Sequence, residues 1–576
     1  MSVVTLTIDN QQVTVPAGTT VLEAARKAGV NIPTLCYLKG INEVGSCRIC
    51  VVEANKSIQT ACVHPVSEGM VVRTNTKRVR ELRKGIFELI IANHNADCTI
   101  CARNLNCELQ RLGKELGVET TPYLKSYPEE EEIVSPTIVR DNSRCINCGR
   151  CVRVCDKVQE AGVLAFNGRS DKMFVSTFYD APLEELSCIN CGQCIVNCPV
   201  GALKEKDQTA EVWAVLNDPA KYVIVQTAPA VRAALGEEFG MPIGTPVTGK
   251  MAAALRRLGF KKVFDTDFAA DVTIMEEGTE LLGRVEKGGV LPMITSCSPG
   301  WIKFCEHNYP DLLDNLSTCK SPQNMMGALL KSHYAEMAGI NPDDIVVVSV
   351  MPCTAKKFEV GREELEVDGR RDVDISITTR ELAKMIKQAD IDFTKLPDEK
   401  FDEFYGDSTG AAVIFGVTGG VMEAALRTLA DILSGKDLQN VEYHDVRGLE
   451  GVREAEIEVK EGLKLKVALA HGGSNIKKLM DQVRSGKAPY HFIEVMACPG
   501  GCIMGGGQPI VSDQVRSEID VAVERAKALY SEDEKAAEYR KSHQNPSVKR
   551  LYDEYLKEPN GHLSHKLLHT HYQKRG

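Results

Sequence analysis

The sequence predicts a multidomain chain, with small α+β modules in its N-terminal third, then a large α/β domain and a helical C-terminal tail. Three patterns predict this fold class. Fifteen of the 21 cysteines lie between Cys36 and Cys198, which is typical of small cysteine-rich modules. From about residue 222, short apolar runs alternate with helix-like segments, as in a sheet of buried and mostly parallel strands. Charged helical segments follow over residues 515–576, and we expect them to form surface helices that pack back on the core.

Composition and charge exclude several classes of protein. The 576 residues are 43% hydrophobic and 26% charged, which is ordinary for globular domains and excludes disorder and a small disulfide scaffold. The net charge of −10 argues against nucleic acid as a partner. No run of 18 apolar residues predicts a membrane span, and the N-terminus does not resemble a signal peptide. We therefore expect a cytoplasmic protein without a membrane partner, whose clustered cysteines bind metal.

Residues 1–78 predict a small β-rich domain with one helix near residues 20–28. Its four cysteines resemble the ligands of a plant-type 2Fe–2S site, although the first gap is longer than in that pattern. A zinc ribbon is the alternative. The predicted 2Fe–2S ligands are Cys36, Cys47, Cys50 and Cys62.

Residues 79–125 predict a second metal module. Apolar residues at helical spacing over residues 76–93 lead into one histidine and three cysteines. A histidine at a helix end is usually a capping or surface residue, and a zinc site is a further alternative. Next to other iron–sulfur motifs, a 4Fe–4S cluster with one imidazole ligand is favoured. Its predicted ligands are His94, Cys98, Cys101 and Cys107.

Residues 138–208 contain one motif twice, CINCGRCVRVC and CINCGQCIVNC. This is the run of two-cluster bacterial ferredoxins, in which the fourth cysteine of each run binds the other cluster. Two zinc sites are the alternative and fit poorly, because zinc knuckles use paired Cys-x2-Cys units. One predicted cube is bound by Cys145, Cys148, Cys151 and Cys198, and the other by Cys188, Cys191, Cys194 and Cys155.

Residues 217–514 predict the large α/β domain. The apolar runs VIVQTA, VFDTD, VLPMITS, DIVVVSVMPC, AAVIFG, LKVALAH and YHFIEVMACPG are expected to be strands. Three cysteine motifs, TSCSPGW, MPCTAKKFE and EVMACPGGCIMGGGQP, overlap or follow such runs. Open α/β sheets place their sites at the carboxyl ends of strands. Cys297, Cys353, Cys498 and Cys502 are thus expected to converge on another cubane, with buried structural cysteines as the alternative.

At these three loops the chain resembles an iron-only (FeFe) hydrogenase of the long clostridial layout, over essentially its whole length. The resemblance implies a six-iron H-cluster, in which Cys502 joins a 4Fe–4S cube to a two-iron subcluster with CO, cyanide and dithiolate-amine ligands. It also implies that Lys356 contacts a cyanide ligand, and that Met351 and Met496 make soft contacts over the two-iron unit. A solvent-facing lysine and plain core methionines are the alternatives. Three accessory 4Fe–4S clusters and one 2Fe–2S cluster complete the expected cofactors.

One residue departs from the family. Many members read TSCCPGW, where the second cysteine binds the cube and the first relays protons, whereas this chain has Ser298 at the second place. Since only Cys297 offers a thiolate, the chemistry favours Cys297 as the ligand, with Ser298 as a nearby hydroxyl. Position-by-position transfer gives the opposite assignment.

A proton path is also implied by the resemblance. Glu277, Glu280 and Arg284 are spaced to share one face of a predicted helix. With Ser317 they match the family's path between the buried metal and water. A solvated helix face that pairs Glu280 with Arg284 is the alternative.

The resemblance predicts an enzyme that interconverts H2, protons and electrons. Its expected partners are ferredoxin and flavin- or NADH-oxidising subunits. The rival functions are an H2 sensor of the same fold and a non-catalytic electron-transfer subunit of an NADH dehydrogenase-like complex.

Overall fold

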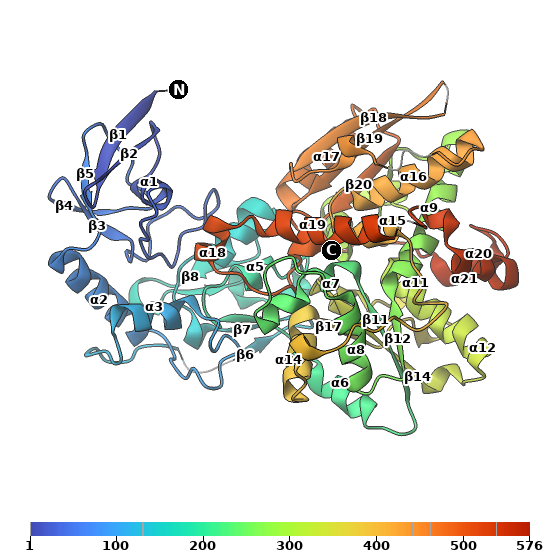
Figure 1. Ribbon diagram of the computed structural model, residues 1–576, viewed down its shortest axis with the longest axis horizontal. Coiled ribbons are helices and arrows are strands. Elements are labelled where there is room, and N and C mark those ends of the chain that lie inside the picture. The colour runs from blue at the N-terminus through green and yellow to red at the C-terminus, as the bar shows by residue number, and fades with distance from the viewer. Residues whose placement is uncertain (1, 129–131, 439–441, 461, 537, 576) are drawn as a thin grey trace.

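The structure is a computed structural model that describes residues 2–128, 132–438, 442–460, 462–536 and 538–575. A group of small N-terminal modules lies beside a larger C-terminal lobe along the long axis of the molecule (Figure 1). Helix α18 (Asp513–Glu518), which follows the lobe in sequence, returns to the N-terminal modules. There Arg26 of helix α1 (Val21–Lys27) donates to Asp513 at 2.6 Å. The lobe is therefore connected to the N-terminal modules by the chain that precedes it and by the α18 contact that follows it.

The first module is a five-stranded sheet with strand order β2-β1-β5-β3-β4 and one helix. Helix α1 begins after Thr20, whose hydroxyl accepts from the Glu23 amide, as expected for an N-cap. The alternating strands place their apolar residues on α1 and form a core of their own. The strands are β1 (Val3–Ile8), β2 (Gln11–Pro16), β3 (Val51–Ala54), β4 (Ser57–Thr60) and β5 (Val71–Arg73).

A region of helices and short strands connects this module to the large lobe. Helices α2 (Lys77–Ala92) and α3 (Glu108–Leu116) pack together, and Phe87 of α2 fills the space beside Gly113. Short helices α4 (Arg150–Arg153) and α5 (Gln193–Val196) each lie within a cysteine run. The strands of this region are β6 (Glu132–Val134), β7 (Ile138–Asp141), β8 (Ala165–Asn167), β9 (Phe174–Ser176) and β10 (Leu203–Glu205).

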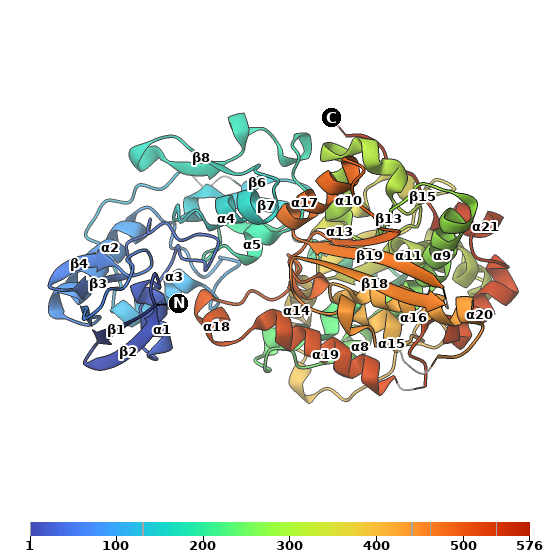
Figure 2. The ribbon, with the colours of Figure 1, turned by 90° about the horizontal axis from the view of Figure 1, so that it is seen from above.

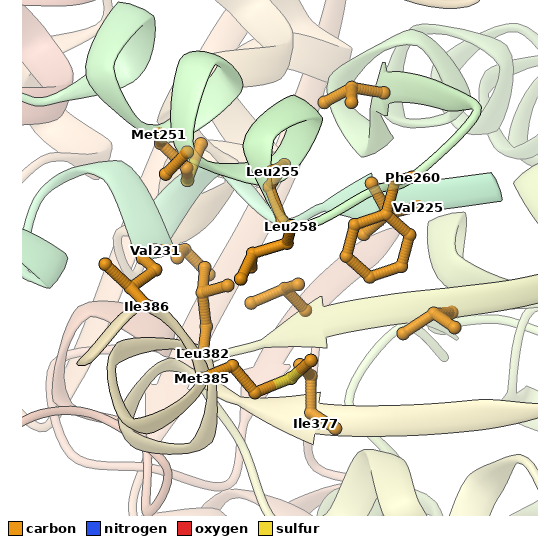
Figure 3. Packing of buried hydrophobic residues seen from close by; sticks show 14 of the residues in the cluster. Val225, Val231, Met251, Leu255, Leu258, Phe260, Ile377, Leu382, Met385 and Ile386 are labelled. Atoms are coloured by element: carbon orange, nitrogen blue, oxygen red, sulfur yellow. The ribbon is translucent and has the colours of Figure 1, made fainter. Parts of the chain in front are cut away.

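The first sheet of the lobe is wholly parallel, with order β12-β11-β14-β17. Leu255 of α8 and Leu258, which directly follows α8, pack on one face of it together with Leu382 and Met385 of α14 (Figure 3). Helices α9 and α11 cover the other face. These elements are β11 (Tyr222–Thr227), β12 (Lys262–Asp265), β14 (Ile345–Met351), β17 (Ile375–Thr378), α6 (Thr209–Leu216), α7 (Pro229–Arg232), α8 (Thr248–Arg257), α9 (Thr266–Lys287), α11 (Pro322–Leu329), α12 (Ala335–Ala338), α13 (Ala355–Glu359) and α14 (Thr379–Gln388).

The second sheet has order β13-β20-β19-β18, and only its edge strand β18 is antiparallel to its neighbour. Helix α16 covers one face, and α10 and α17 cover the other, as Figure 2 shows from above. The elements are β13 (Met293–Ile294), β18 (Val452–Lys460), β19 (Leu463–His471), β20 (Phe492–Met496), α10 (Pro299–Asn308), α16 (Gly420–Ser434) and α17 (Gly473–Arg484). A two-stranded ribbon, β15 (Glu366–Val367) with β16 (Arg370–Arg371), lies outside both sheets.

One of the predicted strands is wrong. The run AAVIFG, residues 411–416, forms helix α15 (Gly410–Val413) and a further helical turn. Periodicity alone does not distinguish a short apolar run in a strand from one in a buried helix. Here the small residues decide, because a Cβ on Gly410 would lie 2.1 Å from Asp533 of helix α19 (Val521–Lys535). Glycine and alanine let α19 approach α15 closely.

The C-terminal tail packs against the lobe rather than extending from it. Asp533 of α19 accepts two hydrogen bonds from the fully buried Arg427 at 2.9 Å. Helices α20 (Pro546–Leu551) and α21 (His562–Leu568) lie beside α9 in both views (Figures 1 and 2). Their apolar residues join the core between α9 and α11. No helix in the described parts of the chain is both long and apolar enough to cross a membrane.

Candidate catalytic and metal sites

The three cysteine loops meet at one cavity in the large lobe. Each loop follows the carboxyl end of a strand, namely β13, β14 and β20. The hollow that they line holds roughly 840 Å³ free of protein atoms, counting its opening, and its lining is mostly apolar. The predicted site residues that line it are Cys297, Ser298, Met351, Cys353, Lys356, Met496, Cys498 and Cys502. The structure thus brings together every residue predicted for the catalytic cluster.

Lys356 is held inside this cavity and does not face solvent. Its side chain is 11% exposed, and its ammonium donates to Glu359 Oε2 at 2.7 Å and to the Cys297 carbonyl at 3.3 Å. Ser321 and Gln323 both donate to the same Glu359 oxygen at 2.9 Å. Glu359 therefore fixes the lysine, and it is a site residue that the sequence did not reveal. The spacing Lys-x2-Glu on a helix was the available signal.

Cys297 and Ser298 point to different parts of the cavity. Burial raises the pKa of the Cys297 thiol, and the next largest cause is the charge of Glu277. Ser298 Oγ instead accepts from the amide of Ala497 at 3.3 Å, next to Cys498. Cys297 therefore lies near Glu277 of α9 as well as near Cys502, whereas the Ser298 hydroxyl contacts the backbone that leads to Cys498.

The predicted proton path forms a connected set of side chains. Glu277 is buried, and desolvation followed by repulsion from Glu280 raises its pKa to about 8. Ser317 bonds to Glu277 and donates to Glu280 Oε2 at 3.0 Å. Arg284 binds Glu280 Oε1 at 2.6 Å nearer the surface. The solvated helix face that the sequence also allowed is excluded for Glu277, which is only 3% exposed.

The two predicted ferredoxin cubes correspond to two separate cavities. Cys145, Cys148, Cys151 and Cys198 line one, and Cys155, Cys188, Cys191 and Cys194 line the other. In each set three thiols come from one run and the fourth from the other run. Tetrahedral zinc would need thiols about 3.8 Å apart. Among the described residues neither set has three ligand atoms within 4.8 Å of one another, so the spacing fits cubes better than zinc.

The cysteines of the first module form two close pairs. Cys50 Sγ and Cys62 Sγ are 3.3 Å apart, and Cys36 is hydrogen-bonded to Cys47. Two pairs suit two iron atoms, each bound by two thiolates. Asn42 is fully buried between this site and the next, and it donates to the carbonyls of Cys36 at 2.7 Å and Cys148 at 3.0 Å.

His94 lies just beyond α2, and its Nδ1 is 2.9 Å from the Arg144 carbonyl. Burial lowers the pKa of this imidazole to about 4, which keeps it neutral. An Nδ1–H that donates to a carbonyl leaves Nε2 free to bind metal. Of the three cysteines that follow, Cys101 reaches toward Gly201, where a Cβ would lie 2.4 Å from its Sγ. Cys107 Sγ is 3.7 Å from the Pro199 carbonyl, beside Cys198, and Cys98 lies on the loop between.

The second cube cavity adjoins the catalytic cavity. Cys191 lines both. Gln193 donates to the Met504 carbonyl at 2.9 Å, and Thr354 donates to the Asn190 carbonyl at 2.6 Å. A Cβ on Gly192 would lie 2.5 Å from Thr354 Oγ1, so the loops are in direct contact. Cys305 and Cys319 belong to none of the five predicted metal sites; Cys305 donates to the Tyr309 carbonyl.

Family profiles match almost every part of the chain. Residues 221–506 match the iron only hydrogenase large subunit, C-terminal domain, and residues 519–575 match the iron hydrogenase small subunit. Residues 2–77 match a 2Fe-2S iron-sulfur cluster binding domain. Residues 83–122 match the NADH-ubiquinone oxidoreductase-G iron-sulfur binding region, and residues 135–204 match the NADH-quinone oxidoreductase subunit 3, ferredoxin-like domain.

Whole proteins and solved structures agree with these matches. The chain is 49% identical to the NADP-reducing hydrogenase subunit HndD of Solidesulfovibrio fructosivorans, over the full length of both. It is 43% identical to iron hydrogenase 1 of Clostridium pasteurianum, over 99% of this chain and 100% of that one. A solved variant of the FeFe hydrogenase HydA1 from Chlamydomonas reinhardtii is 43% identical, with a TM-score of 0.57, over 64% of this chain and 99% of that one.

Proposed function

The chain belongs to the iron-only hydrogenases, and from that membership we propose how its residues divide the work of H2 oxidation and proton reduction. The enzyme is an oxidoreductase with 2Fe–2S and 4Fe–4S domains ahead of its catalytic domain. One observation carries the assignment of roles. The cysteines of three distant loops, with a buried lysine, line a single cavity that adjoins the cavity of the second ferredoxin cube.

We propose that this cavity holds the six-iron H-cluster. Cys353, Cys498 and Cys502 supply thiolates, and Cys502 joins the cube to the two-iron unit. When bound, the group supplies the redox chemistry, with CO, cyanide and a dithiolate amine on its two-iron part. The chain contributes the apolar enclosure, the Lys356 ammonium for an anionic ligand, and the polarizable sulfurs of Met351 and Met496.

The fourth corner of the cube has two candidate ligands, Cys297 and Ser298. Thiolate chemistry favours Cys297, but its position supports a different role. Glu277 is its principal charged neighbour, whereas Ser298 Oγ lies at the amide before Cys498. We therefore propose that Cys297 passes protons to Glu277 and that Ser298 occupies the ligand place.

Paired substitutions distinguish the two assignments. If Ser298 binds the cube, then Ser298→Ala loses the cube's iron and its electron paramagnetic resonance signal, Ser298→Cys keeps both, and Cys297→Ala keeps the iron but turns over slowly. If Cys297 binds the cube, Cys297→Ala loses the iron and Ser298→Ala keeps it. Iron content and spectra are measured before activity, so loss of the cube is distinguished from slow turnover in a variant that keeps it.

We propose that protons then move from Cys297 through Glu277, Ser317 and Glu280 toward Arg284. The supporting contacts are the Ser317 bonds to both carboxylates and the raised pKa of Glu277, which lets it hold a proton near neutral pH.

We propose that four accessory clusters carry the electrons: one 2Fe–2S cluster, one 4Fe–4S cluster with His94 as a ligand, and two ferredoxin cubes. The proposed modules are residues 1–78, 79–125, 138–208, 217–514 and 515–576. The likeness to an NADP-reducing hydrogenase subunit supports NAD(P)H-linked flavoprotein subunits as partners, with ferredoxin as a second carrier, in the cytoplasm. Turnover driven by reduced ferredoxin, compared with turnover driven by NADH and added partner subunits, tests the carriers.

The test of the catalytic assignment is H2 evolution from reduced methyl viologen by anaerobically matured protein, with infrared spectra of the same sample. We expect fast turnover together with CO and cyanide bands. Bands with negligible turnover would instead indicate an H2-sensing role. The absence of both, in protein with full accessory iron, would contradict a catalytic role and leave an electron-transfer subunit.

A further inference from the structure

The proton path cannot continue through Arg284. Arginine stays protonated and offers no acceptor, so it does not take up the proton that Glu280 must release. Its guanidinium is also held in place, because it donates to the carbonyls of Asp314 at 3.1 Å and Leu316 at 2.7 Å as well as to Glu280. Arg284 therefore orients Glu280 and stabilises its charge, and another group must carry the proton outward.

Glu280 has another polar neighbour, Thr318, whose hydroxyl can both donate and accept a hydrogen bond. Thr318 Oγ1 donates to Glu280 Oε2 at 3.2 Å, and the same hydroxyl is 2.8 Å from Nδ1 of His569. A hydroxyl has one proton and two acceptor lone pairs, so it bonds as donor to either neighbour while accepting from the other. Thr318 thus links the carboxylate to an imidazole by two hydrogen bonds.

His569 is placed between the buried path and the surface. Its side chain is 4% exposed, and Nε2 is 3.2 Å from Glu276 Oε2. Its ring centroid lies 4.3 Å from that of His565, whose side chain is exposed. Imidazole is the side chain whose ordinary pKa allows it to gain and lose a proton near neutral pH.

The C-terminal segment holds this histidine rigidly. The Thr570 amide donates to the Thr318 carbonyl and the Lys320 amide donates to the Leu568 carbonyl, both at 2.8 Å. These bonds pair the segment with the loop that also carries Ser317. Glu276 is fixed in turn by the Tyr552 hydroxyl and the Asn560 amide, both at 2.6 Å. The tail residues therefore build the surroundings of His569 and determine where it lies.

A metal ion is the competing use of these groups. Ligand atoms of Glu280, Cys319 and His569 lie within 4.8 Å of one another. However, the Glu280 oxygens already accept from Arg284, Ser317 and Thr318, and both imidazole nitrogens have partners. A cation would have to displace these bonds, so the set is better described as a hydrogen-bonded relay.

We propose that His569, reached through Thr318, is the outward proton carrier for Glu280, and that the C-terminal tail is part of the proton path. In proton release, the Glu280 carboxyl gives its proton to Thr318 Oγ1 as Thr318 gives its own to His569 Nδ1. The imidazolium then loses one proton to water on the side of His565. One proton enters and one leaves, and no group is oxidised or reduced. H2 oxidation uses this direction and proton reduction reverses it.

The charged and titratable groups that face His569 are few. Helix α9 contributes Glu276 and Glu280, the paired loop contributes Cys319, and the tail contributes His565, while Tyr552 donates to Glu276. Arg284 contacts Glu280.

The inference rests on the proton path proposed above, and the experiment separates the two. The full-length matured enzyme is compared with His569→Gln, His569→Ala and Glu280→Gln, with His571→Ala as a control at an exposed histidine two residues away. His569→Gln keeps hydrogen-bonding capacity but does not titrate, so we expect proton reduction to slow by on the order of 10- to 100-fold. The control should keep the wild-type rate and pH profile.

Chemical rescue distinguishes a proton-carrying role of His569 from a purely structural one. His569→Ala should regain rate when imidazole is added, whereas Glu280→Gln should not. If Glu280→Gln keeps the wild-type rate, the path itself fails. If Glu280→Gln is slow but His569→Gln is as fast as the wild type, or if imidazole does not accelerate His569→Ala, the role of His569 is overturned.

Discussion

The N-terminal modules and the large lobe build their metal sites in opposite ways. In the modules, all four predicted ligands of the 2Fe–2S site lie within 27 residues of sequence, from Cys36 to Cys62, and the sulfurs already form close pairs. In the lobe, the lining of one cavity comes from loops between Cys297 and Cys502. Spacing alone therefore identifies a local site, whereas a site assembled from distant loops depends on how the sheets pack.

The largest expected effect tests this difference directly. Cys353→Ala should abolish H2 turnover with methyl viologen, because the assembled cavity loses a ligand that no neighbour replaces. Cys50→Ala should remove only the 2Fe–2S signal and leave viologen-driven turnover close to wild type, since viologen can reduce the remaining clusters. Turnover and cluster spectra of the two variants check this. Equal loss of activity in both would show that the module is needed for the lobe's fold.

The second effect concerns Glu277, which the large lobe buries. Glu277→Gln should lower turnover by about 10²- to 10⁴-fold, as for loss of a positioned proton carrier. Because the pKa of Glu277 is raised to about 8, the wild-type carboxyl is protonated at pH 7 and loses its proton as the pH rises past 8. Wild-type proton reduction should therefore fall above pH 8. Glu286→Gln, at an exposed position on the same helix, should leave the profile unchanged.

The third effect concerns a module boundary. In Gly201→Ala, the new Cβ would lie 2.4 Å from Cys101 Sγ, so the cysteine must move and the His94 cluster should be lost or altered. Its spectrum and iron content measure this. Gly85→Ala in helix α2 is the matched control, since a Cβ at that position would have no such neighbour within 4 Å. An unchanged His94 cluster in Gly201→Ala would place Cys101 outside that site.

The smallest effect on activity concerns the tail's attachment. Asp271 accepts from Thr409 and from Asn545 of the tail, and burial raises its pKa to about 6 from 3.8. A raised folded-state pKa adds stability below pH 4 that is lost as the pH rises through 6. Asp271→Asn removes this dependence, so the stability difference between wild type and variant should change by up to about 3 kcal/mol between pH 4 and pH 7. Thermal unfolding at both pH values checks the sign.

Much of the fold followed from sequence pattern, because strand and helix periods are local. The runs at β11, β14 and β20 were predicted as strands, and each carries its motif at the expected end. The run at residues 411–416 failed because burial on all sides removes the periodic signal. Its neighbours in α19 come from more than a hundred residues away.

The candidate sites likewise contain residues that the sequence predicted and residues that it did not. The predicted ligands of the two cubes line two separate cavities. In each cavity the fourth cysteine comes from the other cysteine run. Glu359, Thr318 and His569 were not identified, because nothing in their own sequence marks a residue whose role depends on a distant partner. The roles that we propose for Cys297 and Ser298 depend on which neighbours each side chain contacts, and sequence spacing does not contain that information.

The contacts of Asn42 and Gly201 bear on how the loss of one metal site would affect the supply of electrons. Asn42 joins the 2Fe–2S site to the Cys148 loop, and Gly201 joins the Cys101 loop to the neighbourhood of Cys198. Both therefore reach the same cube cavity, and among the described residues Cys191 connects the second cube cavity to the catalytic one. We therefore expect the two outer sites to supply electrons to the first cube independently, and the two cubes to pass them on in sequence. Loss of one outer site should leave a supply of electrons, whereas loss of either cube should cut off the catalytic cluster.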